Sequence, residues 1–165
     1  MKYNAILKVG VLIENNGRLL LIKERNWKNG KYQWNIIKGT HNSLKDKNLI
    51  DTVMRESLEE ANAIIKIESL QNIIYLKKHN QPFIQLNFIA KLKHIKKNPI
   101  NKILKPKKHD DGRSEDIIEI KFFNKTELKK MKIGELIGER AYISIQNWLN
   151  NESFPIKALK NVKNY

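Results

Sequence analysis

The sequence predicts an α+β fold in which helices pack on a mixed β-sheet. Two observations lead to this class. Runs rich in isoleucine, leucine and valine lie before and after one segment, residues 48–61, in which apolar residues recur at three- and four-residue steps. A second segment with helical spacing lies near the C-terminus. No internal repeat or break in composition divides the chain, so we expect one domain over residues 1–165.

The N-terminal part predicts a hairpin and a third strand. The β-rich runs AILKVGVLIE and RLLLIKER are separated by Asn15-Asn16-Gly17, and asparagine and glycine both tolerate the positive φ of a tight hairpin turn. After a looser stretch, QWNIIKG predicts a third strand that ends at Gly39. The polar stretch THNSLKDK that follows is expected to be a loop.

The helical segment begins at Asn48 and is followed by Asn62, and asparagine is the common non-glycine residue at a left-handed helix end. We expect about four turns of amphipathic helix. Its apolar face is predicted to consist of Ile50, Val53, Met54, Leu58 and Ala61. The side of the helix opposite these residues should therefore be the accessible one.

The rest of the chain predicts further strands and two helices. IIKIESL, NIIYLKK and FIQLNFIAKLK have strand composition, and HNQP joins the last two as a turn. Residues 91–111 contain eight lysines and two prolines and are expected to form a long loop. DIIEIKFF predicts a strand, NKTELKKM a short capped helix, and GERAYISIQNWLNN a longer helix.

Composition narrows the class of protein. The chain has no cysteine, which excludes disulfides and thiol nucleophiles and fits a reducing cytoplasm. The N-terminal stretch has no small-residue cleavage site, so we expect a strand there and not a signal peptide. No apolar run approaches the roughly 20 residues of a membrane span. We therefore expect a cytoplasmic protein with no membrane partner.

The chain is strongly basic, with a net charge of +15 from 32 Lys and Arg against 17 Asp and Glu. Such a charge can attract nucleic acids or small phosphorylated substrates. Only five of the basic residues are arginines, however, and arginine is the usual reader of base edges. Lysine, asparagine and isoleucine dominate, as in proteins of AT-rich genomes. Compositional drift and attraction to polyanions both stay open.

Against this charge, the central helix carries three glutamates at i, i+3 and i+4, which are Glu56, Glu59 and Glu60. Such positions share a helix face, with side chains about 5–6 Å apart. Carboxylates this close raise one another's pKa unless a cation lies among them, and hard oxygen ligands suit Mg²⁺ or Mn²⁺. Taken alone, the pattern also fits an ordinary solvated helix face, so the neighbouring sequence has to decide.

The stretch from WNIIKGT through TVMRESLEEAN resembles the signature of the Nudix hydrolase family, which is a glycine, a loop and then R-E-U-x-E-E-x-G-U, where U is bulky and apolar. The match runs from Gly39 to Ala63, and its charged positions are Arg55, Glu56, Glu59 and Glu60. The order of hairpin, strand and helix matches as well. The resemblance implies an α/β/α sandwich in which the catalytic helix and the C-terminal helices enclose a mixed sheet.

The match departs from the family pattern at several positions. Asn62 stands where the family has glycine, and Ser57 and Ala63 occupy its apolar positions. The loop is about two residues longer than usual, and its customary glutamate has no clear equivalent, since Lys45 and Asp46 are the nearest candidates. The tripeptide before the loop reads I-K-G in place of P-G-G or P-K-G. These changes concern the loop more than the helix carboxylates.

The resemblance also implies a mechanism. The three glutamates would bind one or more Mg²⁺ ions, which Mn²⁺ can replace, and the metal would bridge a substrate diphosphate and activate water. Glu56 and Glu59 would lie nearest the attacking water, and which of them is the general base stays open. Arg55 would organise the loop and helix by pairing with a carboxylate. The Gly39 carbonyl would complete the metal shell.

Other residues are candidates for further roles. The late segment SEDIIEIKFFNKTEL is expected to supply one more acid, Glu115 or Glu119. Trp27 and Tyr32 stand in a polar stretch and are candidates for stacking on a nucleobase, and Lys38 is a candidate substrate contact.

The expected function is Mg²⁺-dependent hydrolysis of a pyrophosphate bond in a nucleoside diphosphate linked to another moiety. Nucleoside triphosphates, dinucleoside polyphosphates, nucleotide sugars and the RNA 5′ end all remain open as partners, and the lysine-rich residues 91–108 favour a highly anionic one. The alternative is a non-catalytic module that binds a nucleotide or RNA. The three retained carboxylates favour the enzyme, and a homodimer is compatible with either function.

Overall fold

The computed structural model describes residues 5–78, 81–96, 107–108 and 114–160. Its main sheet has eight strands and is mixed, because β1 pairs in parallel with β6 and antiparallel with β2 and β4. The strands of this sheet are β1 (Ile6–Asn15), β2 (Arg18–Arg25), β3 (Tyr32–Asn35), β4 (Ile37–Thr40), β5 (Ala63–Lys78), β6 (Gln81–Ile95), β9 (Ile117–Phe123) and β10 (Phe154–Pro155). A separate pair consists of β7 (Lys107–Lys108) and β8 (Ser114–Glu115).

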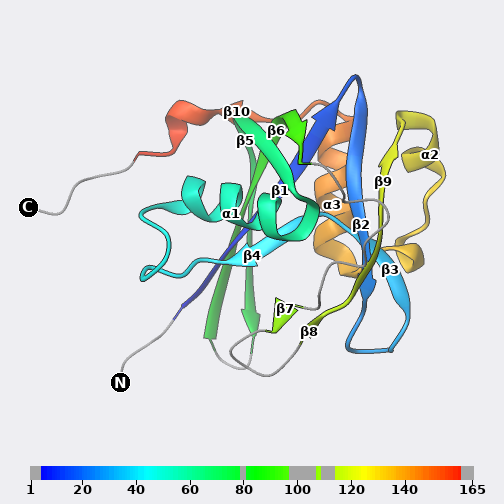
Figure 1. Cartoon of the computed structure of the whole chain (residues 1–165), viewed down its shortest axis with the longest axis horizontal. Coiled ribbons are helices and arrows are strands. Elements are labelled where there is room, and N and C mark those ends of the chain that lie inside the picture. The colour runs from blue at the N-terminus through cyan, green and yellow to red at the C-terminus, as the bar shows by residue number, and fades with distance from the viewer. Residues whose placement is uncertain (1–4, 79–80, 97–106, 109–113, 161–165) are drawn as a thin grey trace, which may run out of the picture.

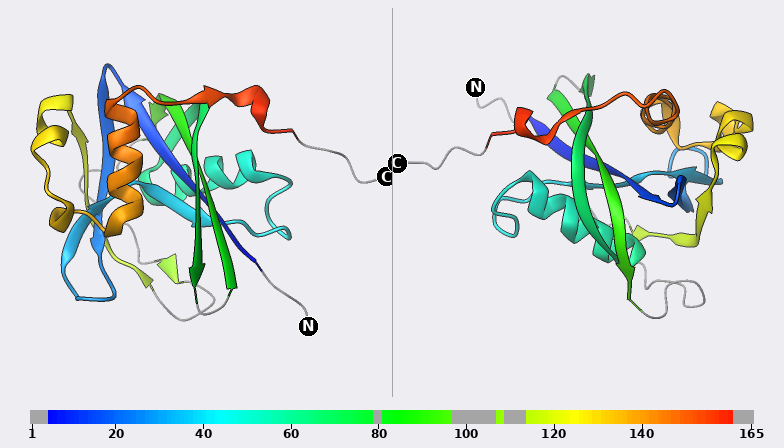
Figure 2. Two further views of the ribbon diagram at one scale, coloured as in Figure 1. Left: turned by 180° about the vertical axis from the view of Figure 1, so that it is seen from behind. Right: turned by 90° about the horizontal axis from the view of Figure 1, so that it is seen from above.

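Helices cover both faces of the sheet (Figure 1 and Figure 2). The helix α1 (Leu49–Ala61) lies on one side, and α2 (Lys125–Lys130) and α3 (Gly138–Leu149) lie on the other. Short 3₁₀ turns occupy Ile133–Glu135 and Ile156–Ala158. One apolar core joins α1 to the sheet and a second joins the sheet to α2 and α3. The predicted α+β sandwich is confirmed, and no helix in the described part of the chain could cross a membrane.

Several local predictions are confirmed. Asn16 and Gly17 both have positive φ, 50° and 72°, and they join β1 to β2 in a two-residue turn. The helix α2 begins with a capping box between Asn124 and Glu127, as NKTELKKM indicates. The loop after β4 and the helix α3 also lie where the sequence places them.

Three strand predictions are wrong. QWNIIKG is not one strand, because β3 pairs with β2 while β4 pairs with β1, and the chain changes partner between them. IIKIESL and NIIYLKK were expected to be two strands, but they form the single strand β5. Shifts in the register of β5 against β6 mark β-bulges within it. Residues 91–95 of the predicted loop extend β6, and 107–108 form β7. The rest of that loop and part of HNQP lie outside the described residues.

Candidate active site

The acidic helix is held at both ends by asparagine. The Asn48 side chain accepts a hydrogen bond from the Asp51 N–H at 3.0 Å, which caps the first turn. Asn62 ends the helix with φ 50° and ψ 25°, and its N–H donates to the Leu58 carbonyl at 3.0 Å. Asparagine therefore adopts the left-handed conformation predicted for it.

The predicted apolar face of α1 is confirmed for Ile50, Val53 and Ala61, which belong to or pack against the core, and is wrong for Met54 and Leu58. Met54 and Leu58 are 48% and 37% exposed, whereas Glu56 and Glu60 are only 3% and 1% exposed. The buried face consists of Thr52, Val53, Glu56, Ser57, Glu60 and Ala61. The reason is that α1 packs against β4 as well as the apolar core, and the edge of β4 accepts polar side chains. Of the three glutamates, only Glu59 lies at the accessible surface.

The edge of β4 explains how two buried carboxylates are accommodated. The Lys38 N–H donates to Glu60 Oε2 at 3.2 Å. A Cβ on Gly39 would lie 1.9 Å from Glu56 Cδ and 2.0 Å from its Oε1, closer than side-chain atoms approach. Only glycine therefore lets the Glu56 carboxylate sit directly against the backbone of β4.

Arg55 joins the glutamates to the loop that precedes the helix. Its Nη1 donates to Glu56 Oε1 at 2.6 Å and to Glu59 Oε2 at 2.9 Å. Its Nε and Nη2 donate to Asp46 Oδ1 and Oδ2 at 2.8 and 2.9 Å. The acidic neighbours, Asp46 first, hold the pKa of Arg55 above its usual range. The guanidinium thus connects three carboxylates.

Asp46 is the loop acid that pairs with the helix, and the sequence identified it only as one of two candidates. It is 4% exposed, and it also accepts hydrogen bonds from the Asn42 N–H at 3.2 Å and the Thr52 hydroxyl at 3.0 Å. The hydrogen bonds from Arg55 hold the pKa of the Asp46 carboxyl well below its usual range despite burial. Lys45 is exposed.

Besides Asp46, Glu56 and Glu60, Glu24 is a buried acid near this edge, and the sequence did not indicate it because one acid in a strand gives no recognisable pattern. Its Oε1 accepts a hydrogen bond from Asn35 Nδ2 at 2.6 Å and pairs with the Lys38 ammonium. Burial alone would raise the pKa of Glu24, but Lys38 and the hydrogen bonds lower it on balance. Lys38 thus contacts Glu24 through its side chain and Glu60 through its backbone N–H.

The two further acids predicted late in the chain are Glu119 and Glu115. Glu119 on β9 pairs with Lys23 at 3.7 Å, and the Lys23 ammonium lies over the Trp34 ring, which packs into the core beside α3. Glu115 lies in β8, and its side chain is outside the described residues. The structure therefore does not bring Glu119 to the acids of α1.

The two aromatic candidates are exposed where β2 and β3 connect. Arg25 lies over the Trp27 ring at 5.6 Å from its centroid. The Tyr32 hydroxyl donates to Asp116 Oδ2 at 2.6 Å, and this bond raises the pKa of Tyr32. Both rings are accessible, and each already has a polar neighbour.

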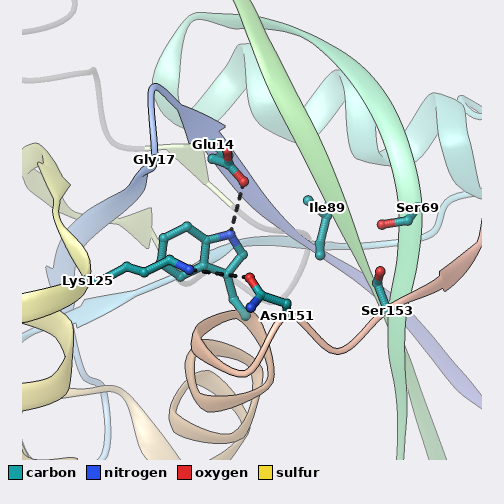
Figure 3. A pocket seen from close by; sticks show the side chains of 8 residues that line it. Glu14, Gly17, Ser69, Ile89, Lys125, Asn151 and Ser153 are labelled. Atoms are coloured by element: carbon teal, nitrogen blue, oxygen red, sulfur yellow. Dashed lines mark hydrogen bonds between the residues drawn. The ribbon is translucent and has the colours of Figure 1, made fainter.

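A cavity of about 320 Å³ lies on the other side of the molecule, between the β1–β2 hairpin, β5, β6 and the end of α3 (Figure 3). Trp148 Nε1 donates to Glu14 Oε2 at 3.4 Å, and the Lys125 ammonium lies 5.3 Å from the centroid of the Trp148 ring. All the described residues that line it belong to elements other than α1 and β4. It is therefore separate from the carboxylates.

The donor set at α1 fits a hard divalent cation. Glu56, Glu59, Glu60 and the Gly39 carbonyl offer only oxygen, and the missing Cβ at Gly39 brings backbone and carboxylate together. Among the described residues no three acids or histidines already converge as a metal site. Arg55 contacts Glu56 and Glu59 together, so metal binding would require these side chains to rearrange.

The comparisons agree with this geometry. A family model described as the NUDIX domain matches residues 6–141. The structure of a NUDIX hydrolase from Nitrosomonas europaea is similar with a TM-score of 0.73 at 17% identity, covering 96% of this chain and 98% of that chain. No curated protein matches the sequence.

Of two further similar structures, one is a complex with a nucleotide-type ligand and the other is named for an enzymatic activity. The NUDIX domain of Shewanella oneidensis NrtR complexed with ADP ribose has a TM-score of 0.64 at 12% identity, over 90% of this chain and 88% of that chain. An ADP-ribose pyrophosphatase from Streptococcus suis 89-1591 has a TM-score of 0.58 at 18% identity, over 88% of this chain and 90% of that chain. At these identities the likeness shows the fold alone.

Proposed function

The chain belongs to the NUDIX domain family, and on that premise we propose that it is a Mg²⁺-dependent pyrophosphohydrolase acting on a nucleoside diphosphate linked to another moiety. One observation carries the proposal. Two carboxylates of the signature, Glu56 and Glu60, are buried against the edge of β4, with Glu59 beside them at the surface. Burying acids is unfavourable unless cations or hydrogen bonds compensate, so this arrangement suits a cation-binding site better than a solvated helix face.

The proposed roles follow from position. Glu56, Glu59, Glu60 and the Gly39 carbonyl would hold the metal, which supplies charge neutralisation for the diphosphate and a more acidic bound water. Glu56 or Glu59 would accept the proton of the attacking water. Arg55 would position the carboxylates through its bonds to the loop acid.

Nucleotide-type ligands are supported by two of the similar structures, since one holds ADP ribose and another is named an ADP-ribose pyrophosphatase. The positive charge of the whole chain favours any such anion. The alternative is a binding module without turnover, and the observation in its favour is the contact of Arg55 with both Glu56 and Glu59.

The test is a screen for hydrolysis products, separated by anion-exchange chromatography, over nucleoside triphosphates, dinucleoside polyphosphates, ADP-ribose and other nucleotide sugars, with Mg²⁺, Mn²⁺ or EDTA. We expect metal-dependent turnover that falls roughly 10²-fold or more in Glu59→Gln, because removing a carboxylate weakens both metal binding and proton transfer. Glu59 is partly exposed, so the variant should fold. Glu68→Gln, an equal charge change at an exposed strand position, is the control.

Turnover that needs no metal, or an undiminished rate in Glu59→Gln, would contradict the proposal. Binding of ADP-ribose without hydrolysis of any compound in the screen would support the binding module instead.

A further inference from the structure

The sheet face that α3 covers carries an unusual row of polar side chains. Lys8 on β1 stands in register with Thr40 on β4 and Gln85 on β6. In the next row, Gly10 stands beside Lys38 and Asn87. Since side chains alternate along a strand, these residues share one face of the sheet. The same face carries apolar residues of the second core further along β1, such as Leu12.

An arginine reaches into this polar layer from α3. Arg140 Nη1 donates to Gln85 Oε1 at 2.6 Å, and its guanidinium carbon lies 4.6 Å from the centroid of the Phe83 ring. Gln85 Nε2 donates in turn to Asn87 Oδ1 at 2.8 Å, and Asn87 Nδ2 donates to Ser144 Oγ at 2.9 Å. The guanidinium is therefore held in one orientation by an aromatic ring and an amide.

The amide network that holds Arg140 has little freedom. Gln85 and Asn87 are 1% and 0% exposed. A Cβ on Gly10 would lie 2.1 Å from Asn87 Oδ1 and 3.0 Å from Gln85 Nε2, so the strand leaves room only for glycine. Such a fixed network directs Arg140 without neutralising its charge.

Lys8 adds a second cation to this layer. Burial first, and then the positive charges of Lys38 and Arg140, lower the pKa of Lys8 to about 8, while Glu60 and Glu56 act in the opposite direction with smaller effects. Lys8 and Arg140 are both partly exposed, so a solute can reach them.

Within the described part of the chain, the acids near Lys8 offset only part of the cost of its charge. Burial lowers the pKa of Arg140, and in the described part of the chain its guanidinium contacts the Gln85 amide and the Phe83 ring. Glu60 and Glu56 raise the pKa of Lys8, but each has a smaller effect than Lys38 or Arg140, which lower it. Glu24, a buried acid that also acts on Lys8, already pairs with Lys38. Two neighbouring cations that lose hydration and are only partly compensated are unfavourable, and a bound anion would offset that cost.

We propose that Lys8 and Arg140 form an anion subsite that binds a phosphate group of the substrate other than the pyrophosphate cleaved at α1. A guanidinium that donates one hydrogen bond to Gln85 still has N–H groups for a bidentate phosphate contact, and the Lys8 ammonium adds a point charge. The subsite would favour substrates with at least one additional phosphate, such as nucleoside triphosphates, over nucleoside diphosphate sugars. This choice of substrate rests on the proposed function.

Binding of inorganic triphosphate in EDTA, measured by calorimetry, tests the subsite without metal or turnover. We expect Arg140→Gln and Lys8→Gln each to weaken binding about 10-fold or more, and Arg140→Lys to retain part of it. Lys66→Gln, the same charge change at an exposed site paired with Glu68, should bind like the wild type. Thermal unfolding of each variant shows whether it is folded. Wild-type affinity in folded Arg140→Gln and Lys8→Gln would overturn the proposal.

A second measurement separates this proposal from the proposed function. With Mg²⁺, the two glutamine variants should raise KM for a nucleoside triphosphate about 10-fold, leave kcat within a few-fold, and change KM for ADP-ribose little. If triphosphate binding depends on both residues but no substrate is hydrolysed, the subsite stands and the hydrolase proposal fails. Equal KM increases for both substrates would overturn the assignment to an additional phosphate.

Discussion

Arg55 donates two parallel hydrogen bonds to Asp46, from Nε to Oδ1 at 2.8 Å and from Nη2 to Oδ2 at 2.9 Å. Nine residues separate the two in sequence. The pair fixes the loop before α1 to the helix, while the remaining guanidinium nitrogen, Nη1, contacts Glu56 and Glu59. The positions of the carboxylates thus depend on an acid outside the helix.

Replacing Asp46 by asparagine should destabilise the protein and reduce turnover. Losing one partner of a fully buried ion pair costs roughly 3–5 kcal/mol. Because the Arg55 side chain is 22% exposed, we expect about 2–3 kcal/mol of lost unfolding free energy. Urea denaturation measures this loss, and kcat at saturating Mg²⁺ should fall about 10-fold as the carboxylates lose their support. Lys45→Gln, an exposed neighbour, is the control, and an equal loss in both variants would contradict the assignment.

The same pair predicts how stability depends on pH. The pKa of Asp46 is depressed in the folded state relative to about 3.9 in the unfolded chain. The contribution of ionised Asp46 to the unfolding free energy is therefore complete above about pH 5 and is lost as the pH falls toward the folded-state pKa. The difference in unfolding free energy between wild type and Asp46→Asn should shrink as the pH is lowered from 6 to about 2.5. A difference that stays constant over this range would count against the pair.

Gly39→Ala should reduce activity more than stability. The new Cβ would lie 1.9 Å from Glu56 Cδ, so the carboxylate must move from the edge of β4. We expect kcat/KM to fall roughly 10²-fold, with about 1–3 kcal/mol of lost stability from overpacking. Gly134→Ala is the matched control, since nothing lies within 4 Å of its Cβ position. Unchanged kcat/KM in Gly39→Ala would show that the close approach has no role in the reaction.

Lys8→Met should stabilise the protein at neutral pH. The pKa of Lys8 is about 8 in the folded state and about 10.5 otherwise, so the charged form disfavours folding below pH 8. Each pKa unit corresponds to about 1.4 kcal/mol, and partial exposure reduces the effect, so we expect a gain of about 1–2 kcal/mol at pH 7. The gain should shrink between pH 8 and 10, where the folded wild type loses its charge. A loss of stability in Lys8→Met at pH 7 would contradict this prediction, because it would show that the Lys8 charge favours folding.

Local sequence determined much of this structure. The Asn16–Gly17 turn, the Asn62 end of α1 and the capping box of α2 each depend on interactions within a few residues, so their residue types were informative. The spacing of Arg55 and the glutamates was informative for the same reason, because i, i+3 and i+4 positions are neighbours on any helix.

The orientation of α1 could not be obtained in this way. Hydropathy placed Met54 and Leu58 inside and the glutamates outside, but a helix buries whichever face its neighbour accepts. Here the neighbour is the edge of a short strand with a glycine, which accepts Glu56 and Glu60. The division of QWNIIKG into β3 and β4, which creates that edge, depends on strand pairing with residues 8–25.

Sequence alone therefore determined which residues belong to the acidic helix and which family signature they match. Tertiary structure decided which carboxylates are buried, that Asp46 and not Lys45 supports Arg55, and that Lys8 and Arg140 come together from opposite ends of the chain. The physical reason is that hydrogen-bonded turns and helix spacing are short-range, whereas burial and charge compensation depend on residues brought together only by the folded sheet.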